Sequence, residues 1–524
     1  MKSQRVASLM SAMLFAVTAF ASAPKVKTTS GIVQGKEVGK VQAFLGIPYA
    51  APPVGDLRWK PPAPVASWKG VRKATDFGSH CPQGNVFGDM VFRDPGASED
   101  CLTLNIWVPE KLAPEKSASA KLPVMVWIYG GGFVAGTTSE GRQEGSKLAQ
   151  QGVIVVSMNY RLGLFGFLVL PELTKESGHN ASGNYGLMDQ LAALKWVHEN
   201  IAAFGGDPEN VTIFGESAGS FSVSAHMVSP LSKGLFQKAI GESGAAFSST
   251  GLSFDRRTQR EEKDLKLVSE KLGVKTLAEL RAFPTEKILA PFIPPKSEGF
   301  DFGPDIDGYF LPEPASAIFA AGKQNDVPLL AGWNHDENSF AVVLSQQKPT
   351  AESLKATAQK DFPNKSEEFL KLYPTDTDEH VLRSAIDYSS DQFISFSTWE
   401  WLEAHSRTSK QPIYRYRFDL PFPPAPNAPN MGAYHSAEIE YVFGQLDSKP
   451  GVTWRADDRQ LSELMQKYWA NFARSGNPNG PGLPNWPAYS SAEGWPVMHL
   501  DAQSAARKDD LRDRYLFLES AWSK

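Results

Sequence analysis

A serine at the corner between a strand and a helix constrains this chain more than any other feature. The segment 211–228 begins with residues typical of a strand and continues with a helix-forming run, VTIFGESAGSFSVSAHMV. Ser217 lies between them, and side chains at Gly215 or Gly219 would collide with neighbouring backbone. Such a corner lifts a hydroxyl above the sheet edge, beside the N-terminus of a helix. The segment therefore predicts a nucleophile elbow, the turn that presents a reactive serine.

Apolar runs alternate with helical patterns along the rest of the chain. Short runs rich in β-branched residues, PVMVWIYGG and GVIVVSMNY, are typical of strands buried on both faces. Later strand-like runs, VPLLAGWN and IYRYRF, are separated by helix-rich stretches at 255–300 and 350–410. A closing helix, LSELMQKYWANFARSG, would end at Gly476. This alternation predicts one large domain with a mostly parallel central sheet, flanked by helices and carrying helical insertions.

The N-terminus has the features of a secretory signal peptide. A lysine and an arginine precede the apolar run ASLMSAMLFAVTAFASA, which ends in small residues. We expect residues 1–21 to be removed, with Ala23 as the alternative end, and 22–524 to form the mature domain. A membrane anchor is the other interpretation, but the run is shorter than the roughly 20 residues that a span requires. The prediction is a secreted or periplasmic protein with no stable membrane anchor.

Charge and motif content exclude several other classes of function. The net charge is −5 and no block of like charges occurs, so the basic stripe of a nucleic-acid-binding protein is absent. The metal-site and redox patterns H-E-x-x-H and C-x-x-C are also absent. We therefore expect no nucleic-acid partner, no metal and no cofactor.

The two cysteines, Cys81 and Cys101, fit an exported protein. An even pair in an oxidising compartment usually forms a disulfide. The closed loop of about 20 residues would stabilise the fold by roughly 3 kcal/mol on the chain-entropy model. Two free thiols are the alternative that the sequence leaves open.

A serine hydroxyl becomes a useful nucleophile only with a base, an acid that orients the base, and donors for the developing oxyanion. The helix after Ser217 offers the backbone N–H of Ala218. A second donor site is predicted at the glycine triplet 130–132, which follows the strand-like run ending at Tyr129. A flexible loop is the other interpretation of such a triplet.

Several long motifs, in order along almost the whole mature chain, resemble the type-B carboxylesterases. This family contains the cholinesterases and many microbial esterases, and the resemblance implies an α/β-hydrolase fold. The matching motifs are FLGIPYAAPPVGDLRW (44–59), SEDCLTLNIW (98–107), WIYGGGF (127–133), NYRLGLFGFL (159–168), GNYGLMDQLAALKWVHENIAAFGGDPENVTIFGESAGS (183–220), GWNHDENSF (332–340), HSAEIEYVFG (435–444) and WANFARSGNPN (469–479).

The resemblance also implies roles for individual residues. The triad order Ser, Glu, His falls on Ser217, Glu337 and His435, with Asp336 as the alternative acid. The oxyanion donors are implied to be the N–H groups of Gly131, Gly132 and Ala218, and Cys81–Cys101 matches the family's first disulfide. Glu216, Ser243 and Glu438 match positions that surround the histidine in relatives. The alternative is that these three residues form a buried hydrogen-bond network without effect on the rate.

The implied function is that of a serine carboxylesterase acting on small-molecule esters through an acyl-enzyme. Cholinesterases carry a tryptophan that stacks on choline in the loop corresponding to 82–100, whereas this loop has none, so choline esters are not expected. The loop is apolar instead, and could form a wall of the substrate site or pack on the core. With an unperturbed histidine, activity should rise near pH 6.5. A lipase or amidase of the same family, or a non-catalytic binding module, are the alternatives.

Overall fold

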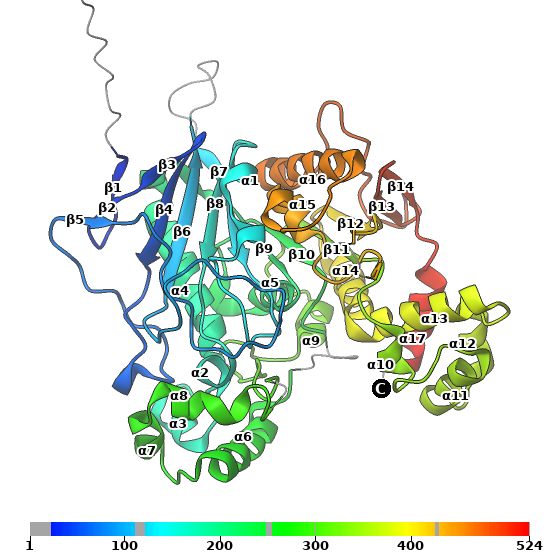
Figure 1. The fold of residues 1–524 in the computed structure, drawn as a ribbon, viewed down its shortest axis with the longest axis horizontal. Coiled ribbons are helices and arrows are strands. Elements are labelled where there is room, and N and C mark those ends of the chain that lie inside the picture. Colours follow the sequence, from blue (N-terminus) through cyan, green and yellow to red (C-terminus); the bar gives the residue numbers. More distant parts are fainter. Residues whose placement is uncertain (1–22, 111–120, 248–253, 298, 425–428, 523–524) are drawn as a thin grey trace, which may run out of the picture.

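The computed structural model describes residues 23–110, 121–247, 254–297, 299–424 and 429–522, so the predicted signal peptide (1–21) lies outside the described residues. Within these ranges an 11-stranded sheet runs through the molecule in the order β14-β13-β12-β11-β10-β9-β7-β8-β6-β4-β3 (Figure 1). Its strands are β3 (Lys36–Val38), β4 (Val41–Pro48), β6 (Thr103–Pro109), β7 (Leu122–Ile128), β8 (Ile154–Met158), β9 (Gly206–Glu216), β10 (Lys238–Glu242), β11 (Leu329–Asn334), β12 (Ile413–Phe418), β13 (Pro496–Leu500) and β14 (Ala505–Lys508).

The middle of this sheet is parallel and its two edges are antiparallel. Neighbours pair in parallel from β8 through β7, β9, β10, β11 and β12 to β13. Antiparallel pairs attach β6, β4 and β3 at one edge and β14 at the other. The predicted mostly parallel sheet is thus confirmed. A small separate sheet consists of β1 (Lys25–Lys27), β2 (Ile32–Gln34) and β5 (Val71–Lys73).

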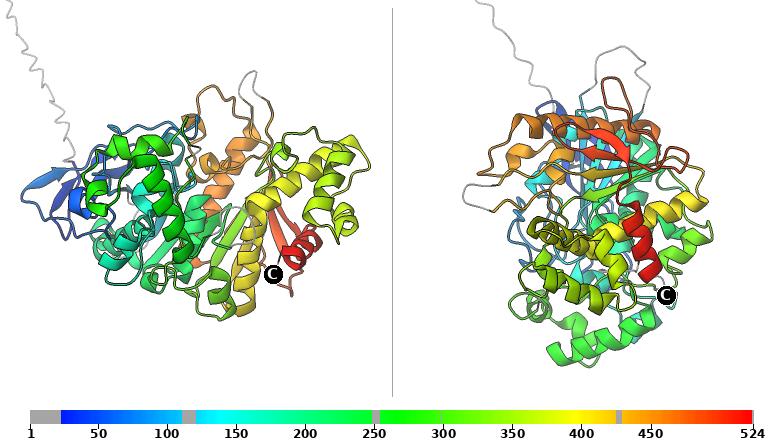
Figure 2. Two further views of the ribbon diagram at one scale, coloured as in Figure 1. Left: turned by 90° about the horizontal axis from the view of Figure 1, so that it is seen from below. Right: turned by 90° about the vertical axis from the view of Figure 1, so that its right-hand side faces the viewer.

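Alternate residues of β10 show which helices cover each face of the sheet. A Cβ on Gly241 would meet Ser220 Oγ at 2.8 Å and the ring of Trp401, so this residue faces α5 (Ala218–Val228) and α14 (Phe396–Thr408). The next residue, Glu242, points the opposite way and accepts a hydrogen bond of 2.8 Å from Trp469 of α16 (Ala456–Ser475). Figure 2 shows α16 on one side of the strands and α14 on the other.

The helix-rich stretches form the predicted insertions, which lie at the lower end and the right-hand side of the molecule in Figure 1. The closing helix α16 ends at Gly476, whose φ of +76° is the left-handed conformation expected of a helix-ending glycine. The remaining helices are α1 (Ser146–Ala149), α2 (Gly163–Phe167), α3 (Pro171–Glu176), α4 (Tyr185–Asn200), α6 (Arg257–Leu272), α7 (Leu277–Ala282), α8 (Thr285–Leu289), α9 (Ala315–Ala320), α10 (Phe340–Val343), α11 (Ala351–Asp361), α12 (Ser366–Leu372), α13 (Asp378–Ser390), α15 (Ile439–Phe443) and α17 (Arg512–Trp522).

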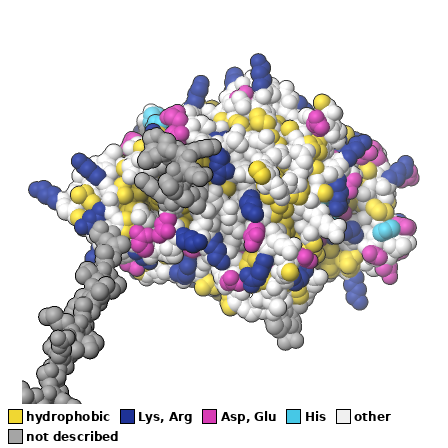
Figure 3. Space-filling model, turned by 90° about the horizontal axis from the view of Figure 1, so that it is seen from above, with side chains coloured by type: hydrophobic (Ala, Val, Ile, Leu, Met, Phe, Trp, Pro, Cys, Tyr) yellow, Lys and Arg dark blue, Asp and Glu magenta, His cyan; other side chains and the backbone are white. Residues whose placement is uncertain are grey.

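Charged side chains of both signs are mixed on the surface. On the face seen in Figure 3, lysine and arginine side chains alternate with aspartate and glutamate and form no continuous basic stripe. None of the helices in the described ranges combines the length and the apolar character needed to cross a bilayer.

Candidate active site

The corner at Ser217 has the predicted geometry. Strand β9 ends at Glu216 and helix α5 starts at Ala218, while Ser217 between them has φ +52° and ψ −121°. This conformation is strained for a residue with a side chain and costs on the order of 1–3 kcal/mol. A Cβ on Gly215 would lie 2.6 Å from Ile128 O, and one on Gly219 would overlap the same oxygen. Both glycines are therefore required by the close approach of β7.

The acid and the base follow the carboxyl ends of two further parallel strands, which lie beyond β10 in the sheet. Glu337 follows β11, and His435 lies in the loop between β12 and α15. Nδ1 of His435 is 2.5 Å from Glu337 Oε2. The other oxygen, Oε1, accepts hydrogen bonds from Ser243 Oγ at 2.5 Å and from the backbone N–H of Asn334 at 2.7 Å. Glu337 is therefore held firmly against the imidazole.

Asp336, the alternative acid, has a different task. Its Oδ1 is 2.5 Å from Arg383 Nη1, and its Oδ2 accepts a hydrogen bond of 2.8 Å from the backbone N–H of Ala433. Asp336 thus anchors the loop that carries His435, whereas Glu337 contacts the imidazole itself.

The other face of the imidazole lies against the elbow. Nε2 of His435 is 3.3 Å from Glu216 Oε1, and Glu216 directly precedes Ser217 in the chain. Ser217 Oγ has no hydrogen-bond partner among the described residues. The structure therefore joins His435 to Glu337 directly, and to the elbow through Glu216. Catalytic hydrogen bonds of a free enzyme often tighten only when substrate binds.

Backbone donors without acceptors lie at the predicted oxyanion positions. Gly131 and Gly132 have φ values of +105° and +62°, and their turn is closed by hydrogen bonds of 3.1 Å from Val134 and Ala135 to the Gly131 carbonyl. Within the described ranges, no group accepts a hydrogen bond from the N–H of Gly131, Gly132 or Ala218. Unused donors of this kind are what an oxyanion requires.

A model of the Carboxylesterase family matches residues 22–517 of this sequence. This chain belongs to the carboxylesterase family. It is 39% identical over 502 residues to para-nitrobenzyl esterase of Bacillus subtilis (strain 168), covering 92% of this chain and 96% of the relative. It is also 39% identical over 479 residues to fumonisin B1 esterase of Sphingopyxis macrogoltabida, covering 88% and 84%. Liver carboxylesterase 1 of Oryctolagus cuniculus is 35% identical over 552 residues, covering 96% and 94%.

Solved structures agree with these relatives. A PNB esterase is similar to this carboxylesterase with a TM-score of 0.79 and 35% identity, covering 95% of this chain and 99% of that one. The resemblance found in the sequence is thereby confirmed, together with the α/β-hydrolase fold and the assignment as a serine hydrolase of carboxylic esters.

Two carboxylates change the acid–base properties of the histidine in this carboxylesterase. Burial favours the neutral imidazole, but the negative charges of Glu216 and Glu337 outweigh it and raise the pKa of His435 to about 9. Burial favours the neutral form of Glu216 as well, and for a carboxyl this raises the pKa. The sequence had suggested a base with an unperturbed pKa, and the two nearby carboxylates are the physical reason for the difference.

The residues predicted to surround the histidine lie at different distances from it. Glu216 contacts the imidazole, and Ser243 contacts Glu337. Glu438 is connected to Glu337 only through Asn334, whose Nδ2 donates a hydrogen bond of 2.5 Å to Glu438 Oε2. Burial raises the pKa of the Glu438 carboxyl well above its usual range.

Sequence reasoning missed Asn334, which is part of this network, and Glu242, a buried glutamate whose side chain is hydrogen-bonded to Trp469 instead. Asn334 bridges Glu337 and Glu438. It lies in the motif GWNHDENSF together with Glu337, so the sequence could have indicated a role for it. Glu242 is fully buried on the α16 side of β10, and burial raises its pKa to about 8. Its neighbour Ser243 was singled out, but nothing in the sequence distinguishes a buried glutamate from an exposed one here.

The apolar loop 82–100 forms a wall beside the oxyanion turn. A Cβ on Gly131 would lie 3.2 Å from Met90 Cε, and the ring of Phe87 lies 6.0 Å from that of Phe300. The loop lines an open pocket of about 320 Å³, of which Ala135 forms another part. Met90 thus brings this loop into contact with the oxyanion turn, which is compatible with a wall of the candidate active site.

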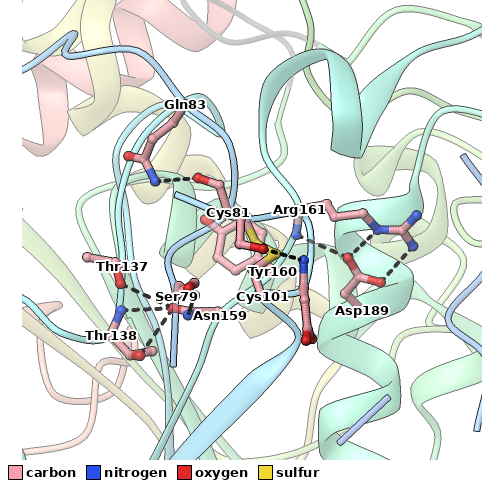
Figure 4. Close-up of a disulfide and its surroundings, with 12 residues drawn as sticks. Ser79, Cys81, Gln83, Cys101, Thr137, Thr138, Asn159, Tyr160, Arg161 and Asp189 are labelled. Atoms are coloured by element: carbon pink, nitrogen blue, oxygen red, sulfur yellow. Dashed lines mark hydrogen bonds and ion pairs between the residues drawn. A yellow bond between two sulfur atoms is a disulfide. The ribbon is translucent and has the colours of Figure 1, made fainter. Parts of the chain in front are cut away.

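The structure contains the predicted disulfide between Cys81 and Cys101, which holds the start of this loop. Close to it, the amide of Gln83 donates to the carbonyl of Gly136 at 2.9 Å and accepts from its N–H at 2.8 Å. Figure 4 shows Gln83 beside the disulfide. Because Gly136 closely follows the oxyanion turn, the disulfide and Gln83 together fix the loop relative to that turn.

The described residues contain no group of three or more His, Cys, Asp or Glu side chains that could hold a metal ion.

Proposed function

We propose that this carboxylesterase hydrolyses small-molecule esters through Ser217, His435 and Glu337, by way of an acyl-enzyme. The contact of 2.5 Å between His435 Nδ1 and Glu337 Oε2, beside the elbow serine, is the observation that carries the proposal. A carboxylate that accepts from Nδ1–H fixes the imidazole tautomer, which leaves Nε2 to accept the proton of Ser217.

The reaction then proceeds in two halves. Ser217 Oγ attacks the ester carbonyl while its proton moves to His435 Nε2, and the alcohol departs with that proton. Water, activated by the same nitrogen, releases the acid from Ser217. Because Ser217 Oγ has no hydrogen-bond partner in the part of the chain that the structure describes, and Nε2 lies by Glu216, we infer that substrate binding draws the hydroxyl and the imidazole together.

The N–H groups of Gly131, Gly132 and Ala218 would bind the oxyanion in both halves. All three N–H groups lack acceptors within the described ranges. Gly131 and Gly132 also have positive φ values, which glycine adopts most readily. Losing one such donor typically costs about 3–4 kcal/mol of transition-state stabilisation.

The apolar wall supports an ester with an apolar acyl or alcohol group. Phe300, whose ring a Cβ on Gly132 would meet, is 49% exposed, and Val91 of the apolar loop is 66% exposed. This exposure gives some support to a second candidate, a lipase that acts on aggregated esters. Rates for p-nitrophenyl acetate, butyrate and palmitate would distinguish the two, because a lipase gains rate when the substrate forms an interface.

We also propose that the protein is exported and cleaved after Ala21. The charged and apolar N-terminal pattern supports this, and so does the disulfide, which persists in oxidising compartments. N-terminal sequencing of the mature protein from the periplasm or culture medium tests it. A chain that keeps its first 21 residues would contradict the proposal.

Labelling with an organophosphate tests the nucleophile. We expect one adduct, located on Ser217 by mass spectrometry, with loss of esterase activity in proportion to labelling. Ser217→Ala should neither react nor hydrolyse p-nitrophenyl acetate above background. An adduct at another serine, or full turnover by the alanine variant, would refute the mechanism.

A further inference from the structure

Both neighbours of the catalytic histidine are held by cations. Tyr434 Oη accepts a hydrogen bond of 2.8 Å from Lys449 Nζ, and Ser436 Oγ accepts one of 3.2 Å from Arg142 Nη1. The arginine comes from a short turn, Gly141–Gln143, which lies 294 positions before Ser436 in the chain. This hydrogen bond connects the segment after the oxyanion turn directly to the histidine loop.

Ser436 has an unusual backbone conformation. Its φ is +67°, in the left-handed region that favours glycine. A residue with a side chain held there costs on the order of 1–3 kcal/mol and persists only when its surroundings enforce it. Because Ser436 is bonded to His435 through one peptide group, its φ helps to set the direction in which the imidazole leaves the backbone.

Arg142 is well placed to enforce this conformation. Its side chain is only 13% exposed, and Nε lies 2.7 Å from Oε1 of the buried Glu140. A more distant carboxylate, Asp89, lies 4.0 Å from Nη1 on the apolar loop. A guanidinium fixed at one end by a buried carboxylate presents its other nitrogens in a defined direction.

We propose that Arg142 is a positioning residue for ester hydrolysis, which holds Ser436 in its left-handed conformation and thereby keeps the His435 imidazole against Glu337. The inference rests on the proposed function, because it assigns His435 as the base. It adds a residue that lies outside every motif quoted for the family.

Arg142 also contributes charge, and that contribution must be separated from the mechanical one. The charged groups that act on the imidazole are Glu216, Glu337 and Arg142 itself. The arginine lowers the pKa of His435, against the larger effect of the two carboxylates. Loss of the charge alone would therefore move the acid limb of the pH profile upward and leave the high-pH plateau unchanged.

The test uses Arg142→Met, Ser436→Gly and the double variant in the full-length mature enzyme. Active sites are counted with an organophosphate, kcat and KM for p-nitrophenyl acetate are measured per site from pH 6 to pH 10, and the plateau kcat is taken from the fitted titration curve. We expect Arg142→Met to lower the plateau kcat about tenfold or more, with KM changed less than about threefold, because a misplaced base slows chemistry rather than binding.

Glycine at position 436 should remove the need for the arginine, since glycine adopts positive φ without strain. We expect the double variant to lie within about threefold of Ser436→Gly alone at the plateau. Arg407→Met, which breaks an exposed ion pair with Glu519, should match the wild type.

Three results would overturn the inference. One is an unchanged plateau kcat in Arg142→Met, with only the acid limb of the pH profile displaced. Another is that Arg142→Met lowers the plateau kcat of Ser436→Gly by the same factor as that of the wild type. The third is a loss that disappears when rates are expressed per titrated site, which indicates a folding defect alone. If the organophosphate fails to label Ser217 in the wild type, the proposed function fails first, and that outcome is distinct from these three.

Discussion

Replacing Glu216 by glutamine should lower the pH at which the carboxylesterase becomes active. The wild-type acid limb of kcat/KM is expected above 6.5, because the His435 pKa is raised to about 9 and only the neutral imidazole can accept the serine proton. Activity is therefore lost as pH falls through this raised pKa. The variant removes the negative charge that lies 3.3 Å from Nε2 and retains the shape of the side chain.

The magnitude follows from the charges around the imidazole. A rise in the His435 pKa from 6.5 to about 9 corresponds to roughly 3 kcal/mol in favour of the protonated imidazole. This is the net effect, because burial acts in the opposite direction. Two carboxylates share this effect. Removing one should lower the acid limb by about one pH unit or more, which is roughly a tenfold larger neutral fraction near pH 7. Because Glu216 and His435 titrate as a pair, the limb reports on both groups together.

The assay is kcat/KM for p-nitrophenyl acetate from pH 5 to pH 10, corrected by active-site titration. Glu242→Gln is the matched control, since burial raises the pKa of Glu242 to about 8 and glutamine therefore imitates its form at pH 7. We expect the control to leave the limb in place. A wild-type limb at or below 6.5, or a limb that Glu216→Gln does not move, would show that the ion pair is absent from the working enzyme.

Three further substitutions test other parts of the site. Gly219→Ala places a Cβ into Ile128 O and should reduce kcat/KM about a hundredfold; near-normal kinetics would mean that β7 does not require a glycine at this corner. Ser243→Ala removes a donor to Glu337 worth about 1.5–3 kcal/mol, so kcat should fall about tenfold to a hundredfold, and an unaltered kcat would contradict a role in holding the acid. Cys81→Ser should lower the free energy of unfolding in urea by about 3 kcal/mol, whereas an unchanged midpoint would exclude stabilisation by the disulfide.

The centre of the fold and the corner at Ser217 could be predicted because each has a local signature, whereas Glu337 and His435 were proposed only through the family resemblance. The strand–serine–helix corner requires glycines on both sides, and buried parallel strands are continuous apolar runs. The structure places Glu337 and His435 in contact, from two motifs that the resemblance pointed out. The antiparallel edges of the sheet were not predicted, because short strands such as β3 and β14 are partly exposed and carry little apolar pattern.

The electrostatic environment of the site could not be predicted in the same way. The raised pKa of His435 depends on a carboxylate from a strand more than 200 residues earlier in the chain. Arg142 lies in a polar turn with no motif, and its importance appears only when Ser436 is found beside it. Contacts between distant segments of this kind have no signature in a single sequence.

In the proposed triad, three parallel strands of one sheet each supply one residue at their carboxyl ends: Ser217 after β9, Glu337 after β11 and His435 after β12, with β10 between the first two strands. If this triad is the catalytic machinery, a nascent polypeptide gains esterase activity only after His435, in the last fifth of the sequence, has been synthesised and placed beside the earlier strands. Translation products that end before His435 would then be inactive, however well their first half had folded.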